Sequence, residues 1–280
     1  MSAATPTLFI PHGGGPCFFM DWTMGPADTW DNLAAWLRGL AATLPARPKA
    51  VVAISGHWEE ACFAVTSAAS PALVYDYYGF PDHTYNLTYP APGAPHLAAG
   101  IVKLLRDAGL PSHPEDRRGF DHGVFIPFKL IYPDADIPIV QISMHENLDP
   151  ALHLAAGRAL APLRDEGVLI VGSGMSYHNM AGFGDPRSRP ESDIFDSWLG
   201  DTLALGDEDA RNAALENWDQ APAARTVHPR EDHLIPLMVA AGAGGADRGE
   251  KIFTDHPMDV AISAFRFGSA RVFPTNIDPF

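Results

Sequence analysis

The stretch Leu8–Phe19, LFIPHGGGPCFF, shows how this chain is organised. An apolar run ends in a histidine, three glycines and a proline before the sequence turns apolar again. Short apolar runs that stop at Gly and Pro are typical of buried strands, so we expect His12 where a strand ends in a tight loop. Sites in α/β proteins are built at the ends of strands. The segment therefore indicates a sheet with a site at its edge.

Similar apolar, β-branched runs recur along the chain, and most of them are continuous rather than alternating. They cover residues 7–10, 49–56, 62–67, 137–144, 167–174 and 262–268. Continuous apolar strands suit a sheet that is covered on both faces. Stretches with helical periodicity lie between them, at residues 28–44, 94–109, 150–167, 193–205 and 207–218. This alternation predicts an α/β fold in which a mostly parallel central sheet is flanked by helices on both faces.

Local signals refine the predicted helices and loops. Asp28 or Thr29 is placed to cap the first helix, while Gly109 and Gly167 follow the second and third helices. Residues 67–95 form a Pro- and Tyr-rich excursion, and loops of that length in a compact domain usually line a site. With no repeat or linker in its 280 residues, the chain is expected to form a single domain over residues 1–280.

Composition excludes several classes of function. The chain has 19 Lys and Arg against 34 Asp and Glu, a net charge of -15, which repels nucleic acid and anionic lipid surfaces. Its two cysteines, Cys17 and Cys62, provide neither a disulfide framework nor a zinc ribbon. No apolar stretch approaches the ~20 residues of a membrane span, and the amino terminus has no basic start. We therefore expect a cytoplasmic, unprocessed protein without nucleic-acid or membrane partners.

Three strand ends carry a histidine: His12, His57 after VVAISG, and His178 after VLIVGSG. A single histidine of this kind is usually a hydrogen-bonded loop or core residue. Recurrence changes that reading, because the carboxyl ends of parallel strands converge at one edge, and neutral imidazole is the commonest protein metal ligand. The pattern predicts a shared metal ion.

A fourth cluster, TVHPREDHLIPLM, contains His228, Glu231, Asp232 and His233 at the start of an apolar helix-like stretch. Two histidines with one carboxylate would suit non-haem Fe(II), whereas an all-histidine set would suit zinc. The residues leave both sets open. Glu231 is equally well explained as an acidic residue of a first helical turn.

His122 lies in GFDHG, between Gly119 and Gly123, at a turn ahead of an apolar segment. The glycines would let the loop backbone approach a ligand closely. Because no metal-spacing partner is nearby, we expect a role in substrate binding or in support of the ligands, or else a structural hydrogen bond.

Other catalytic motifs are incomplete. HGGGP lacks the features of a nucleotide-binding loop, and GSGMS lacks the Gly-x-Ser-x-Gly order that would make Ser173 a hydrolase nucleophile. Aromatic residues beside the site segments, available to stack on a ring, are Trp22, Trp58, Tyr77, Tyr78, Tyr85 and Phe18.

Seven motifs together resemble a known family. In order they are PHGGGP, SGHW, YPAPG, GFDHG, YPDADIPIVQIS, GSGMSYHN and HPREDHLIPL, and they run from His12 to Leu237. The set resembles class III extradiol ring-cleavage dioxygenases, and within them the DOPA-dioxygenase-like branch. This resemblance implies a single catalytic domain in which Fe(II) binds a catechol and O2, and a carbon-carbon bond beside the diol is cleaved to give a muconic semialdehyde.

The resemblance also implies roles for individual residues. The family's metal ligands fall on His12, His57 and His233. The HN histidine, here His178, is the acid/base beside the metal or an additional ligand in related enzymes, and we expect the acid/base role. His122 matches the histidine that faces substrate or oxygen. In the protocatechuate-cleaving branch of the family the third metal ligand is a glutamate rather than a histidine. The resemblance therefore does not decide whether Glu231 or Asp232 is a ligand here.

One departure concerns the first site, where HGGGP is one residue longer than the expected HGSP. That loop lies beside the substrate, so the preferred diol does not transfer. Fe(II) is the expected cofactor, and zinc is able to occupy the same ligands. The alternatives are a zinc-dependent hydrolase and a noncatalytic binding protein on the same fold. The expected partners are a catecholic small molecule and O2. The sequence does not distinguish a monomer from a homodimer.

Overall fold

One sheet, with the strand order β4-β3-β5-β2-β6-β1-β8-β7, organises the computed structural model, which describes residues 4–269. Its strands are β1 (Thr7–Pro11), β2 (Ala50–Glu60), β3 (Phe63–Thr66), β4 (Ser112–Glu115), β5 (Ile139–His145), β6 (Val168–Gly174), β7 (Gly249–Asp255) and β8 (Ile262–Phe267). The central strands β5, β2, β6 and β1 are parallel, while β3 and β8 pair antiparallel with β5 and β1. The prediction of a mostly parallel central sheet is confirmed.

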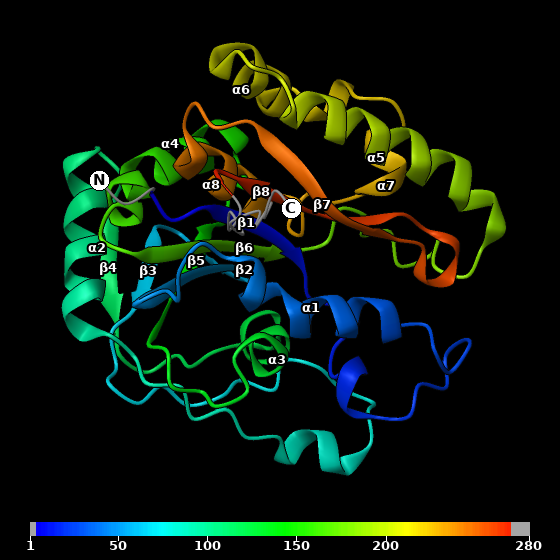
Figure 1. Ribbon diagram of the computed structural model, residues 1–280, viewed down its shortest axis with the longest axis horizontal. Coiled ribbons are helices and arrows are strands. Elements are labelled where there is room, and N and C mark those ends of the chain that lie inside the picture. Colours follow the sequence, from blue (N-terminus) through cyan, green and yellow to red (C-terminus); the bar gives the residue numbers. More distant parts are fainter. Residues whose placement is uncertain (1–3, 270–280) are drawn as a thin grey trace, which may run out of the picture.

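Helices cover both faces of this sheet. They are α1 (Asp31–Thr43), α2 (Pro95–Asp107), α3 (His122–Ile131), α4 (Pro150–Leu160), α5 (Arg189–Leu203), α6 (Glu208–Glu216), α7 (Ala224–Val227) and α8 (Ile235–Gly244). Short 3-10 turns are η1 (Cys17–Phe19), η2 (Asp82–Asn86), η3 (Ala161–Arg164), η4 (Pro186–Ser188), η5 (Trp218–Gln220) and η6 (Pro257–Asp259). Figure 1 shows α1 and α3 on one side of the sheet and α4 and α8 on the other. No helix within residues 4–269 has the length and apolarity needed to cross a bilayer.

Burial explains why the apolar strands are continuous. Every residue of β1 and β6 is buried, because α8 packs against both strands and α3 covers β6 from the other face. Helix α8 is buried along its whole length, which agrees with the apolar helix-like stretch predicted after His233. The central strands are therefore sealed on both faces, and their exposed chemistry is confined to their ends.

The register of the parallel strands brings their carboxyl ends to one edge. Pro11 at the end of β1 lies opposite Gly174 at the end of β6, and Ser55 of β2 lies opposite Ser173. The segments that follow these strands start side by side. This edge is the place that the histidine pattern predicted for a site.

Several elements differ from the predictions. Strands β4 and β7 were not predicted, because they are short or partly exposed strands at the two edges of the sheet and lack a continuous apolar run. Helix α1 starts at Asp31 after Trp30, so the expected side-chain cap by Asp28 or Thr29 is wrong. The helix expected over residues 150–167 ends at Leu160 and continues as the 3-10 turn η3, where Pro162 interrupts helical hydrogen bonding.

The segment around His122 also differs from its prediction as a turn. His122 is the first residue of α3, whose ten residues are almost all buried and include Pro127. The two glycines beside His122 pack against other protein atoms and do not border a ligand cavity. A Cβ at Gly123 would stand 2.3 Å from Ser55 Oγ, and a Cβ at Gly119 would stand 1.9 Å from the Ala72 carbonyl oxygen. Gly123 thus lets α3 pack closely against β2.

Candidate metal centre

Three histidines from distant segments meet at the carboxyl edge of the sheet. His12 directly follows β1, and its backbone N–H donates to the Gly174 carbonyl at 3.2 Å. His57 lies within β2, which runs on to Glu60, rather than beyond the strand, and the β2–β5 register shifts between Ile54 and Glu59. His233 precedes α8, and its carbonyl accepts the N–H of Met175 at 3.0 Å, which holds this turn on the end of β6.

The imidazole nitrogens of these three residues converge. The Nε2 atom of His57 lies 3.2 Å from Nε2 of His12 and 3.1 Å from Nε2 of His233. Two nitrogens held ~2.1 Å from one ion are about 3.0 Å apart at a right angle and about 3.4 Å apart at the tetrahedral angle. The observed separations fall between these values, so the three residues fit the ligand set of a single divalent metal ion.

The protonation of the three rings also fits a metal ligand set. The Nδ1 atom of His12 donates to the Gly13 carbonyl at 2.9 Å, which leaves the lone pair on Nε2. Burial, and after it repulsion among neighbouring histidines, lowers the pKa of His12, His57 and His233 well below the ordinary value. Neutral imidazoles with free lone pairs are what a metal ion requires.

The glycine loop after His12 has a steric reason. Gly13 has φ 81°, and a Cβ there would stand 2.6 Å from Cys17 Sγ and 2.8 Å from Phe18 Cζ. A larger residue would have to displace the side chains of Cys17 and Phe18 and adopt a left-handed backbone conformation, so glycine is favoured beside His12.

His122 lies beside the three histidines and is held by a carboxylate. Its Nδ1–H donates to Asp76 Oδ1 at 2.8 Å, and its backbone N–H donates to the same oxygen at 2.9 Å. Burial raises the pKa of the Asp76 carboxyl, but the hydrogen bonds from His122 outweigh it and bring that pKa below its ordinary value. With Nδ1 engaged, Nε2 of His122 is left as an acceptor. The His122 ring centroid is 3.9 Å from that of His57.

His178 lies against His233 at the same cavity. Its ring stacks on that of His233, with centroids 3.4 Å apart and an interplanar angle of 16°. Asp232 lies next to both rings, with Oδ1 3.8 Å from His178 Nδ1 and Oδ2 3.2 Å from His233 Nδ1. Burial, and after it repulsion from His122, lowers the pKa of His178 to about 4, so the ring is neutral and able to accept a proton.

Two other groupings of possible ligands occur in the described part of the chain. Both include a carboxylate: His57, Asp76 and His122 form one, and His178, Asp232 and His233 form the other. Asp76 already accepts the Nδ1–H and the backbone N–H of His122. Asp232 accepts the His233 backbone N–H and forms an ion pair with Arg230. We therefore favour the all-histidine group as the centre and assign Asp76 and Asp232 to the orientation of the rings.

The remaining residues of the fourth cluster lie away from the centre. Glu231 forms an ion pair with Arg225 at 2.6 Å, and its carbonyl accepts backbone N–H groups at the start of α8. His228 is buried among aromatic rings with Nε2 3.0 Å from the Ser176 carbonyl. Ser173 lies within β6, where its hydroxyl donates to the Gly123 carbonyl. None of these three is placed to act at the centre.

A cavity of about 430 Å³ opens over the five histidines. Its lining consists of His12, Gly13, Gly14, Gly15, Trp22, Met24, Trp30, His57, Phe80, His122, Met175, His178, Met180, Phe183, His233 and Met258. Of the aromatic residues considered from the sequence, Trp22 lines it, whereas Tyr78 is exposed and Trp58 is buried beneath Arg118. Phe80, in the long 67–95 excursion, also lines the cavity.

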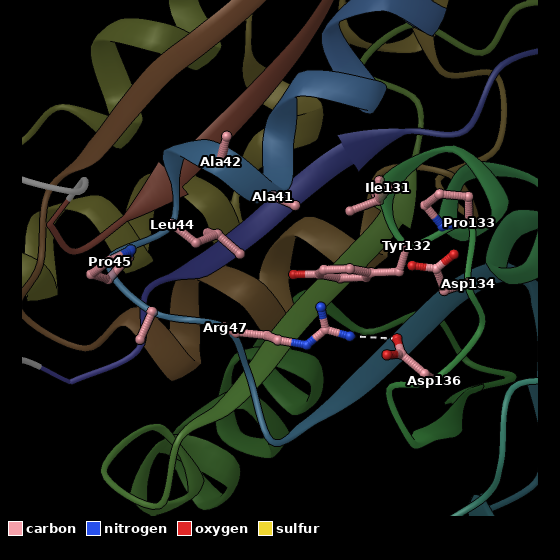
Figure 2. A pocket seen from close by; sticks show the side chains of 11 residues that line it. Ala41, Ala42, Leu44, Pro45, Arg47, Ile131, Tyr132, Pro133, Asp134 and Asp136 are labelled. Carbon is pink, nitrogen blue, oxygen red and sulfur yellow. Dashed lines mark hydrogen bonds and ion pairs between the residues drawn. The ribbon is translucent and has the colours of Figure 1, made fainter.

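A second hollow of about 410 Å³ lies between the end of α1 and the segment after α3 (Figure 2). Arg47 and Asp136, which lie on its wall, form an ion pair with each other. No histidine lines this hollow. It lacks the ligand set of the first cavity.

Some residues of the site were not predicted from the sequence. Asp76 gave no signal, because it lies inside the long excursion, 46 residues before the histidine that it holds. Met175 and Met180 flank His178 in GSGMSYHNM and could have been considered for that reason. Met24 and Phe183 lie in loops and Met258 lies in the 3-10 turn η6, and none of the three belongs to a recognisable motif.

Comparison with known proteins assigns the chain to a family. Residues 6–265 match the family model of the catalytic LigB subunit of aromatic ring-opening dioxygenase. The chain is 42% identical over 243 residues to a 4,5-DOPA dioxygenase extradiol of Beta vulgaris, covering 85% of this chain and 87% of the relative. It is 38% identical over 284 residues to the dioxygenase tasH of Hapsidospora irregularis, covering 95% and 86%.

Two Escherichia coli K12 proteins are also similar to this chain, one compared by sequence and one by structure. A 4,5-DOPA dioxygenase extradiol of Escherichia coli K12 is 32% identical over 282 residues, covering 99% of this chain and 96% of the relative. The crystal structure of an uncharacterized E. coli K12 protein superimposes with a TM-score of 0.74 at 30% identity, covering 94% of this chain and all of the other.

Proposed function

The chain belongs to the LigB family of class III extradiol dioxygenases, and on that premise we propose that it cleaves the ring of a catechol with O2 to give a muconic semialdehyde. We further propose that one divalent metal ion is held by Nε2 of His12, His57 and His233. Fe(II) is the ion proposed to support turnover, and Zn²⁺ is able to occupy the same nitrogens. Residues 1–280 are taken as one catalytic domain.

One observation carries this proposal: Nε2 of His57 lies 3.2 and 3.1 Å from Nε2 of His12 and His233, and all three residues line one cavity. Two neighbouring histidines, His122 and His178, line the same cavity without joining the three-nitrogen group. A set of ligands with separate proton-accepting groups beside it suits a reaction in which a diol binds and loses protons.

When bound, the metal supplies the electronic link between a coordinated diol and oxygen, which do not react readily without it. The chain's own groups supply position and proton transfer. His178, whose Nδ1 faces Asp232, accepts a phenolic proton at Nε2 and returns it later in the reaction. His122, whose Nδ1–H is held by Asp76, presents Nε2 to substrate or oxygen. The apolar walls limit the access of water to the ring.

Metal analysis combined with oxygen uptake tests the proposal. Protein reconstituted anaerobically with Fe(II) should consume O2 when a catechol is added, and a yellow semialdehyde should form in equal amount. Ester or amide hydrolysis with Zn²⁺ and no oxygen uptake would instead support a zinc hydrolase. Protein with no affinity for either metal would support a noncatalytic binding protein.

We also propose a cytoplasmic location. Cys17 and Cys62 are both free thiols in the structure, as a reducing compartment requires. Fractionation of the host cells tests this placement.

A further inference from the structure

Apart from its five histidines, the side chains that line the cavity are apolar. Its other lining side chains are Trp22, Met24, Trp30, Phe80, Met175, Met180, Phe183 and Met258, and the rest of the lining is the glycine loop. Within residues 4–269, no lysine, arginine, carboxylate, amide or hydroxyl side chain lines the cavity. A substrate bound on the histidines would therefore direct its ring substituent against hydrocarbon and thioether groups.

Contacts between loops hold this apolar wall together. The Gly184 N–H donates to the Met258 carbonyl at 2.8 Å, which joins the Phe183 loop to the Met258 loop. A Cβ at Gly25 would stand 3.5 Å from Met258 Cγ, so the Met24 loop lies against the same methionine. Trp22 and Trp30 pack edge to face with centroids 5.6 Å apart. The wall is continuous across three segments that are far apart in sequence.

In the part of the chain that the structure describes, the charged groups near the histidines are carboxylates or arginines that already have partners. Asp76 and Asp232 lie behind the histidines and are themselves negative when ionised. Arg118 lies over Trp58 and pairs with Asp121, while Arg230 pairs with Glu59. A carboxylate on the ring substituent, placed against the apolar wall, would lose hydrogen bonds to water and would form no ion pair in return. Burial of such an unpaired charge is strongly unfavourable.

Resting on the proposed function, we propose that the substrate is a catechol whose ring substituent is uncharged and apolar, and not an amino acid or carboxylic acid. A cavity of about 430 Å³ is large enough for a ring with a hydrocarbon substituent, and apolar pockets of this size are common for such ligands. Met24 and Met180, which are 55% and 70% exposed, form the mouth and adapt to the shape of the substituent.

A matched pair of diols tests the substrate class. 4-Propylcatechol and 3-(3,4-dihydroxyphenyl)propanoate have side chains of equal length and differ only in a terminal methyl or carboxylate. Under argon, calorimetric titration of Zn²⁺-loaded protein should give a Kd at least ~10-fold lower for the propyl compound. Equal or tighter binding of the acid would overturn the inference while leaving ring cleavage intact. If neither diol binds, the proposed function fails, and this inference fails with it.

A variant at the cavity mouth provides a second, independent test. Met180→Lys places a cation beside the substituent. The ratio of the Kd of the acid to the Kd of the propyl compound should fall two- to fivefold, as expected for a partly exposed ion pair. Met180→Leu should keep the preference. Ile194→Lys, at a 51% exposed position of α5 outside the cavity, adds the same charge elsewhere and should also keep it. An unchanged preference in Met180→Lys would contradict the assignment of this wall.

Discussion

The ring of His178 lies parallel to that of His233, with centroids 3.4 Å apart and an angle of 16° between the planes. The lone pairs of two stacked rings run side by side instead of meeting at one point. His233 would hold a metal ion through Nε2, and a ring stacked face to face on it would direct its own nitrogens past that ion. This stacking supports a proton-transfer role for His178 beside the metal.

Replacing His178 with Gln should therefore separate metal binding from catalysis. Metal content and anaerobic catechol binding should remain, while turnover falls ~10²- to 10⁴-fold because the phenolic proton has no acceptor. The absorbance of the bound catechol should show a more protonated form than in the parent protein. Loss of the metal together with activity would make His178 a ligand instead.

His122 is expected to contact substrate or oxygen without touching the metal. His122→Phe keeps a ring of similar size and should leave metal stoichiometry unchanged. The loss should appear in kcat, KM or both, because Nε2 of His122 faces the cavity as an acceptor. Steady-state kinetics of oxygen uptake measure this effect. Unchanged kinetics would return His122 to a structural role at the start of α3.

Asp76 is predicted to be a positioning residue. Asp76→Asn removes the negative charge that receives both N–H groups of His122, so the ring should lose its fixed orientation. We expect kcat to fall ~10- to 100-fold with metal content unchanged, as for other carboxylates that orient active histidines. A double variant with His122→Phe should be no slower than His122→Phe alone. Additive losses would show that Asp76 acts elsewhere.

Acid sensitivity of the fold should come in part from His153. This buried histidine of α4 accepts the His145 N–H at 3.0 Å, and its Nδ1–H donates to the Asp149 carbonyl at 2.7 Å. Burial lowers the pKa of His153 to about 4 from its ordinary value of 6.5. Its neutral form is favoured in the folded state, so its contribution is complete above pH 6.5 and declines as the pH falls toward 4.

The change in stability with pH can be measured by denaturant unfolding. Between pH 6.5 and 4, His153 should contribute a slope of up to about 1.4 kcal/mol per pH unit to the free energy of unfolding. His153→Gln, which offers an acceptor and a donor without titrating, should reduce the slope by that amount. The exposed control His96→Gln should keep the parent slope. An equal slope in the two variants would rule out this role for His153.

The central strands, and the edge at which their carboxyl ends meet, could be predicted from the sequence. Burial on both faces requires an unbroken apolar run in each of these strands, and such a run is visible locally. Strands β4 and β7 have no unbroken apolar run, because edge strands need to bury only part of their residues. Helix α3 was not predicted because it is nearly all buried and so has no amphipathic pattern, while Gly123 and Pro127 indicate a turn.

The site was only partly visible in the sequence for a related reason. His12 follows an apolar strand, His57 follows the apolar run inside β2, and His233 precedes an apolar helix, so the local sequence pattern locates all three. Asp76 and Met258 reach the cavity through long-range packing of irregular loops, which no spacing encodes. Local pattern located the candidate ligands but not the groups that orient them or enclose the substrate.

The stoichiometry of Fe(II) after anaerobic reconstitution and desalting tests the metal centre most directly. The parent protein and the exposed control His96→Ala should each retain one ion per chain. His57→Ala should retain less than about a tenth of that, because Nε2 of His57 lies next to both of the other ligand atoms and two imidazoles bind the ion far more weakly. A His57→Ala protein that is folded by circular dichroism and still retains one ion per chain would contradict the account.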